Sequence, residues 1–158
     1  MLPRKVLDAL FPRRSFKDRR SAFLQERKSL YLGNDEFVRG VFASPSDTEI
    51  KLSVILRRLI GREGHIAPEK LHHCERIVEI EPIICCPSDW RERAFVLQDE
   101  LRALSGQSIN IDMLRMKVLL SFPRGPTGEN PPSRTFGAWI LEATTELSDE
   151  LQRLHLSI

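Results

Sequence analysis

The sequence predicts an all-α protein, and three observations lead to this prediction. Apolar residues recur at steps of three and four along several segments, which is the spacing of a buried helical face. Ser46 with Glu49, and Asp89 with Glu92, have the spacing of capping boxes at helix starts. There is no pair of β-rich segments that could form a sheet together.

Size and composition indicate one ordinary globular domain with appendages. The chain has 158 residues, of which 41% are hydrophobic and 29% are charged. No apolar run approaches the roughly 20 residues of a membrane-spanning helix, and no secretory signal is evident. Of the three cysteines, two are adjacent, which does not suggest a disulfide framework. We therefore expect a reducing, cytoplasmic location.

The first 45 residues are expected to form a basic helical arm. A short amphipathic helix at 3–12 would be followed by a charged link at 13–20. A second helix is expected from 21 to about 33, and a third at 35–42, ended by the Ser-Pro sequence that follows.

The charge of this arm differs from that of the body. Residues 1–28 contain nine Lys or Arg and three Asp or Glu, a balance of +6, whereas the rest has a balance of −4. Such an arm suits a nucleic acid, an anionic membrane or an acidic protein surface. A solvated, partly disordered tail is the alternative. The basic residues that would make the contacts are Arg13, Arg14, Lys17, Arg19 and Arg20.

The predicted core occupies 46–145 and begins with a well-defined helix. Ser46 would cap it, and its buried face would contain Leu52, Ile55, Leu56 and Leu59. Residues 65–82 are predicted to form a long loop that isoleucines attach to the core, with a short strand at 76–80 as the alternative.

The helix at 90–105 is predicted to be the element on which the others pack. Asp89 would cap its start and Gly106 would end it in a left-handed conformation. Its buried stripe would contain Trp90, Ala94, Leu97, Leu101 and Leu104.

Three further segments complete the prediction. A short helix is expected at 112–120, and the Pro- and Gly-rich residues 121–134 are expected to be an irregular linker. The final helical segment would begin near Thr135 and reach the tail at 146–158, as one helix or as two joined at Ser148.

Residues 46–145 resemble an acyl carrier protein. The similar phrases are Leu59-Ile60-Gly61 with 66–71, then Phe95 to Leu104 followed by Gly106 and Ile109, and finally Thr135 to Ile140. The order of the expected helices is also that of the family. The resemblance implies a four-helix bundle, preceded here by the basic arm and followed by the helical tail.

The resemblance also implies a place for a cofactor. The family carries phosphopantetheine on a serine at the start of its second helix, where Ser88 stands here. However, Pro87 and Asp89 replace the family's flanking Asp and Leu, and Arg91 and Arg93 replace acidic residues. We therefore predict a non-catalytic carrier-like or protein-interaction module of unknown partner. A working carrier modified on Ser88 is the alternative, and so is a helix start at which Ser88 is only a capping neighbour.

Possible metal or nucleophilic chemistry is confined to one stretch of the chain. His72, His73, Cys74, Cys85 and Cys86 are of metal-binding types, but adjacent side chains are expected to point alternately and not to converge. We therefore predict no metal site. The two cysteines before the helix start could favour a thiolate, yet no partner base is evident, so they are interpreted as buried structural residues and the chain as not an enzyme.

Overall fold

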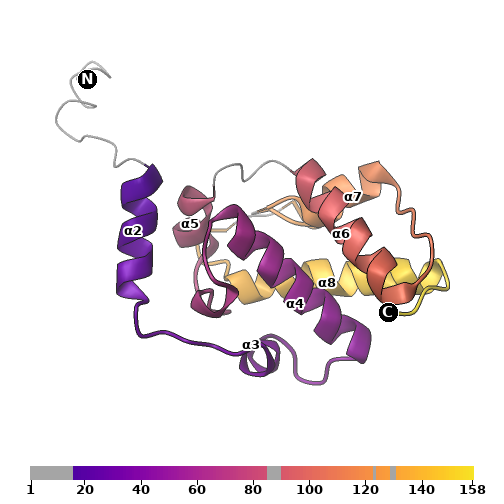
Figure 1. Ribbon diagram of the computed structural model, residues 1–158, viewed down its shortest axis with the longest axis horizontal. Coiled ribbons are helices and arrows are strands. Elements are labelled where there is room, and N and C mark those ends of the chain that lie inside the picture. The colour runs from indigo at the N-terminus through magenta and orange to yellow at the C-terminus, as the bar shows by residue number, and fades with distance from the viewer. Residues whose placement is uncertain (1–15, 85–89, 123, 129–130) are drawn as a thin grey trace, which may run out of the picture.

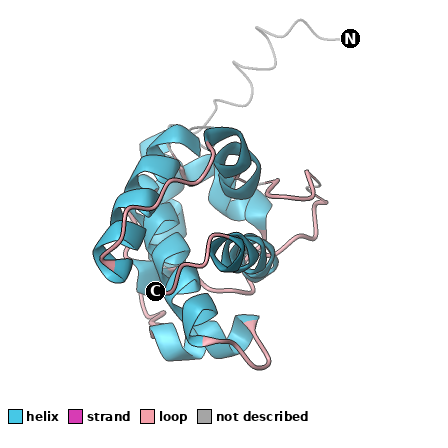
Figure 2. Ribbon diagram, turned by 90° about the vertical axis from the view of Figure 1, so that its right-hand side faces the viewer, coloured by secondary structure: helices cyan, strands magenta, loops and turns pink. Residues whose placement is uncertain are grey.

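The computed structural model describes residues 16–84, 90–122, 124–128 and 131–158, and within them the fold is entirely helical (Figures 1 and 2). This confirms the all-α prediction. The described ranges contain no strand, only one isolated antiparallel bridge between Arg76 and Thr135. Their helices are α2 (Phe16–Glu26), α3 (Asn34–Val41), α4 (Asp47–Glu63), α5 (Ile77–Ile80), α6 (Trp90–Ser105), α7 (Met113–Leu120) and α8 (Phe136–Arg153), with 3₁₀ helices η1 (Pro68–Lys70) and η2 (Glu81–Ile83).

The core lies between α4 and α8, which form the largest helix–helix contact (Figure 1). The α8 helix continues unbroken through Ser148, so the alternative with a joint there is wrong. Its buried face follows the 3.6-residue period of a helix and includes Trp139, which is completely shielded from solvent. Within the described residues, no helix combines the length and apolar character needed to cross a bilayer.

The expectation that α6 organises the fold is wrong. Ala94, Leu97 and Leu101 are buried as predicted, but Leu104 is 50% exposed and Trp90 is only half-buried. The α6 helix packs on α7 and on α4 and covers one side of the core. Its stripe is therefore covered in the middle and open at its C-terminal end.

The predicted helix boundaries of the core are largely confirmed. The Ser46 hydroxyl accepts a hydrogen bond from the Glu49 N–H at 3.2 Å, and the Glu49 carboxylate accepts the Ser46 N–H at 2.8 Å. Thr135 caps α8 through the Ala138 N–H at 3.2 Å. Gly106 has a φ of +65°, the left-handed stop that was expected. The predicted cap Asp89 lies outside the described residues.

The arm helix is displaced from its predicted range. It spans Phe16–Glu26 and not 21–33, and most of the charged residues in its first turns are straight-chain types that are compatible with a helix. Beyond Glu26 the chain forms turns, and Lys70 Nζ donates to the carbonyl oxygens of Lys28 and Leu30 in that segment.

The loop at 65–82 is more ordered than expected. It contains η1, α5 and η2, so the strand at 76–80 is wrong. A strand there would need a partner over its whole length, and the backbone meets the start of α8 only at the Arg76–Thr135 bridge. The isoleucines do fix the loop to the core, since Ile77, Ile80, Ile83 and Ile84 are all buried.

A buried arginine joins three parts of this fold. Arg57 of α4 is completely buried, and its guanidinium donates to Leu71 O at 2.9 Å and to Leu32 O at 2.9 Å. A further bond reaches Asn34 Oδ1 at 3.2 Å, and the guanidinium lies 4.2 Å from the centre of the Phe37 ring. Burial lowers the pKa of Arg57 to about 10, with partial compensation from Glu69 and then Tyr31, so the group is still charged at neutral pH.

A second buried arginine joins α4, α6 and α7. Arg93 of α6 is 1% exposed and forms a two-pronged ion pair with Glu63 of α4, at 2.6 and 2.7 Å. It also donates to Leu120 O at the end of α7, at 3.1 Å. Arg93 is therefore a structural contact among three helices and not an exposed replacement of an acidic residue.

Neighbouring arginines of α4 allow a direct test of the buried contact. We expect Arg57→Ala to lower the free energy of unfolding by about 3 kcal/mol, because it leaves buried carbonyls unpaired and opens a cavity. Arg58→Ala removes an exposed partner of Glu100 and should cost less than about 0.5 kcal/mol. Urea denaturation of both variants measures this, and equal losses would contradict the structural role of Arg57.

Candidate functional site

The segment His72-His73-Cys74 lies between η1 and α5 and is held at both of its ends. Before it, the Leu71 carbonyl accepts hydrogen bonds from Arg57. Along it, the N–H groups of Gly137 and Phe136 donate to His73 O at 2.8 Å and Glu75 O at 2.7 Å. The start of α8 therefore fixes the backbone of this segment.

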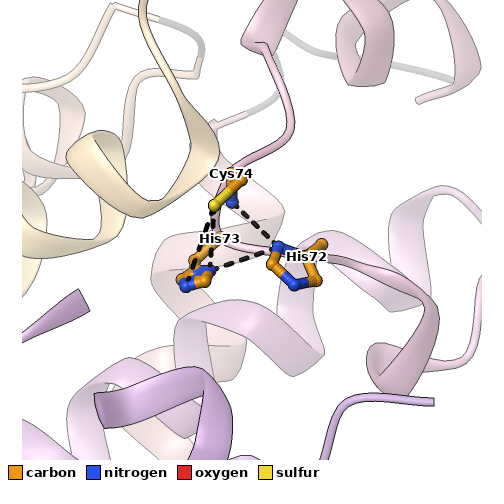
Figure 3. Close-up of side chains that lie close together, drawn as sticks. All are labelled: His72, His73 and Cys74. Carbon is orange, nitrogen blue, oxygen red and sulfur yellow. Dashed lines mark hydrogen bonds between the residues drawn. The ribbon is translucent and has the colours of Figure 1, made fainter. Parts of the chain in front are cut away.

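The three side chains of the segment converge (Figure 3). His72 Nδ1 and His73 Nδ1 are 3.2 Å apart, and His73 Nδ1 lies 3.6 Å from Cys74 Sγ. The Cys74 N–H also donates to His72 Nδ1 at 3.1 Å. One donor atom from each residue lies within 4.8 Å of the other two. The residues converge because 72–75 form a turn, closed by a 3.2 Å bond from Glu75 N–H to His72 O.

The ring of His73 is set by contact with α3. A Cβ atom on Gly40 would lie 1.8 Å from His73 Nε2, so only glycine leaves room for the ring there. On the same side the ring meets Phe37, with centroids 6.2 Å apart. The Nε2 edge therefore faces α3, and Nδ1 faces His72. The sulfur of Cys74 lies beside the ring, 3.6 Å from Nδ1 and 3.9 Å from Nε2.

The environment favours neutral imidazoles. Burial lowers the pKa of His72, and the positive charge of Arg57 adds to the effect. Burial also lowers the pKa of His73, followed by the influence of His72 and of Arg57. Both rings are therefore mainly neutral at pH 7, and a neutral imidazole keeps a lone pair that can accept a hydrogen bond or bind a metal.

We call the three side chains of His72, His73 and Cys74 the cluster, and an open cleft of about 640 Å³ lies beside it. Within it Arg27 of α2 forms an ion pair with Glu75, which is 92% buried. Burial raises the pKa of Glu75, and the bond to Arg27 opposes this rise. The second oxygen of Glu75, Oε2, is buried without a hydrogen-bond partner among the described residues. The lining residues are Glu26, Arg27, Ser29, Leu30, His72, Cys74, Glu75 and Glu79.

A second concave surface, the α4/α6 groove, has a different character. It encloses about 360 Å³ and is lined by Ile50, Lys51, Val54, Ile55, Arg58, Glu100, Ala103 and Leu104. Except for the three charged residues, this lining is apolar. An ion pair between Arg58 and Glu100 joins the two helices.

The site residues predicted from the sequence are not brought together in the described part of the chain. Ser88, Cys85 and Cys86 lie outside the described residues, and so do Arg13 and Arg14.

Three of the predicted basic residues are described, on the first turns of α2. Lys17 is exposed there, whereas Arg19 and Arg20 are half-buried. Arg19 Nε donates to Pro82 O at 3.1 Å, so part of this charge serves packing. Binding of nucleic acid or an anionic membrane through the arm stays a prediction.

Sequence reasoning missed the convergence of His72, His73 and Cys74. The expectation that adjacent side chains point apart holds for extended backbone, whereas this segment is a turn. Pro68 and the lack of periodicity were the available signals for a turn, but neither gave its direction. The chain matches no family model, no curated protein and no solved structure.

Two glycines beside His73 distinguish backbone from side-chain crowding. In Gly137→Ala the new Cβ would meet the His73 carbonyl oxygen at 2.9 Å, and we expect a loss of about 1–3 kcal/mol in unfolding free energy. In Gly40→Ala the imidazole can turn away, and the gain in helix propensity of about 1 kcal/mol offsets the cost. Thermal or urea denaturation compares them, and a stable Gly137→Ala protein would contradict the fixed backbone.

Proposed function

We propose that the chain is a non-catalytic helical module that binds a partner protein, and that the α4/α6 groove receives an amphipathic helix of that partner. The observation that carries this proposal is a mainly apolar groove between α4 and α6, with the half-exposed Leu104 in its lining. Grooves of this kind bind the apolar face of a helix in many recognition modules.

The apolar lining of the groove supports a helical occupant. Ile50 and Val54, one turn apart on α4, are only half-buried, and Leu104 of α6 lies at the same groove. Full burial of an exposed aliphatic side chain is worth about 1.5–3 kcal/mol, so covering one that is already half-buried contributes roughly half of that before the costs of association are subtracted. Leucines at helical spacing on a partner helix would cover these three side chains of the groove.

The charged rim favours an acidic flank on the partner. Arg58 is paired with Glu100, and the other cation in the lining of the groove is the exposed Lys51. A glutamate of the partner helix would meet Lys51, and opposite charges at a rim act mainly on orientation and association rate.

A designed peptide tests the groove directly. The probe is a fluorescent helical peptide with leucines on one face and glutamates on the others, and fluorescence anisotropy measures its binding to the full chain. We expect Leu104→Asp to weaken binding at least about tenfold, or roughly 1.4 kcal/mol, because it places a charge in the apolar contact. The matched control is Leu114→Asp on α7, where the leucine is 75% exposed outside the groove.

The outcome decides the groove proposal. Binding to the wild type, unchanged in Leu114→Asp and weakened in Leu104→Asp, supports it. A peptide of the same composition in scrambled order should bind no better than the Leu104→Asp variant. No binding to the wild type, or equal binding to both variants, overturns it.

The acyl-carrier-like interpretation belongs to the same proposal. The helices α4, α6, α7 and α8 occur in the order that the resemblance implies, with a long connection between the first two. This supports a carrier-like bundle that has kept docking and lost the attachment of a prosthetic group.

Intact-mass analysis tests whether attachment is lost. After incubation of the full chain with coenzyme A and a promiscuous phosphopantetheinyl transferase, we expect no added mass, because Pro87 and Asp89 replace the residues that flank the family's serine. An authentic carrier protein in the same reaction is the positive control. Addition of a phosphopantetheine mass that disappears in Ser88→Ala would instead make the chain a working carrier.

A further inference from the structure

We infer that His72, His73 and Cys74 form a binding site for a borderline-soft divalent cation of the Zn²⁺ type. The site lies between α3, α8 and the cleft beside α2, away from the α4/α6 groove, and it is independent of the function proposed above. Two imidazoles and one thiol are ligands that favour zinc over magnesium or calcium, which prefer oxygen.

The distances support this assignment. With Zn–N bonds of about 2.05 Å and a Zn–S bond of about 2.3 Å, a tetrahedron places two nitrogens about 3.3 Å apart and a nitrogen and a sulfur about 3.6 Å apart. The Nδ1 atoms of His72 and His73 are 3.2 Å apart. His73 Nδ1 and Cys74 Sγ are 3.6 Å apart. Two of the three distances between ligand atoms thus match a tetrahedron. Because Cys74 Sγ also lies 3.9 Å from His73 Nε2, the thiol turns toward the Nδ1 side as the ion binds.

The cluster is also held in position before binding. Gly40 and Phe37 keep the Nε2 edge of His73 against α3, and Nδ1 points toward His72. The bond from Gly137 N–H to His73 O fixes the backbone. Positions set by the core reduce the entropy that a flexible site would lose on binding.

Binding requires three exchanges at the cluster. The proton of the hydrogen bond between the two Nδ1 atoms moves through solvent to Nε2 of the same ring, which frees both Nδ1 lone pairs. The Cys74 thiol releases its proton to solvent and binds as a thiolate, so one proton leaves as one Zn–S bond forms. His72 Nδ1 gives up the N–H of Cys74 and donates its lone pair to the ion, while the Cys74 amide turns to water. The fourth position takes a water molecule from the cleft, since His72 and Cys74 line it.

Cobalt substitution of the full, reduced chain tests the site, because Co²⁺ bound to a thiolate gives a charge-transfer band in the near ultraviolet. We expect one Co²⁺ per chain with this band, and its displacement by Zn²⁺. Cys74 is exposed, so Cys74→Ser should fold normally, lose the band and bind Zn²⁺ at least about tenfold more weakly against a chromophoric chelator.

Matched variants assign the ligands. The chain has four histidines, and His65→Ala with His155→Ala removes the two outside the cluster without changing the affinity for Zn²⁺. Cys85→Ser with Cys86→Ser should keep the band. Gly40→Ala changes no ligand but displaces the His73 ring, so it should weaken Zn²⁺ binding about 10- to 100-fold, while circular dichroism confirms the helical fold.

Three results would contradict the metal site. The site is overturned if no band forms, if the band survives Cys74→Ser, or if it disappears in the Cys85→Ser, Cys86→Ser variant. Leu104→Asp should bind Zn²⁺ as the wild type does, so failure of the groove and failure of the metal site are distinguishable.

Discussion

The buried guanidinium of Arg57 is the contact on which the geometry of the cluster depends. Removal of a charge from water is unfavourable, and the lowered pKa of Arg57 reflects this cost. Two loop carbonyls and the side-chain oxygen of Asn34 at the start of α3, together with the Phe37 ring, offset it. Because each of these oxygens must be in place for the charge to be tolerated, Arg57 fixes the backbone at Leu32 and Leu71 more strictly than apolar packing would.

The position and the electrostatics of the cluster depend on this contact. His72 follows Leu71 directly, and the charge of Arg57 contributes to the lowered pKa of both imidazoles. At the other side, the first N–H groups of α8 are unpaired within their own helix and bond to the carbonyls of His73 and Glu75. An irregular segment is thereby held by hydrogen bonds from α4 and α8, although it has no repeating hydrogen bonds of its own.

The sequence predicted the parts of the fold that depend on local chemistry. Ser46 with Glu49, Thr135 and Gly106 mark helix ends through bonds or dihedral angles within a few residues of themselves. Periodicity likewise located α4, α6 and α8. It did not show which helix is central, since the stripe of α6 and the stripe of α8 have the same spacing and differ in what covers them.

The parts that failed depend on partners far apart in the chain. Arg57 and Arg93 belong to residue types that are mostly exposed, and only their distant acceptors make them buried residues. The candidate site was missed for the same reason, because Gly40 is more than thirty positions from His73 in the sequence and yet determines where the ring lies. The resemblance to a carrier pointed to Ser88, which lies outside the described residues, and not to this turn.

Two adjacent residues of α4 face the two proposed sites of the molecule, the cluster and the groove. Arg57 faces inward to the carbonyls before the cluster, whereas Arg58 faces outward to Glu100 beside the groove. Coupling between two sites requires an element with two arrangements that each ligand favours differently. The α4 helix is packed along α8 by large buried side chains, and such an interior resists small displacement. A partner in the groove would therefore meet a rigid surface, and the cluster on the other side would keep its geometry whether or not that surface is covered.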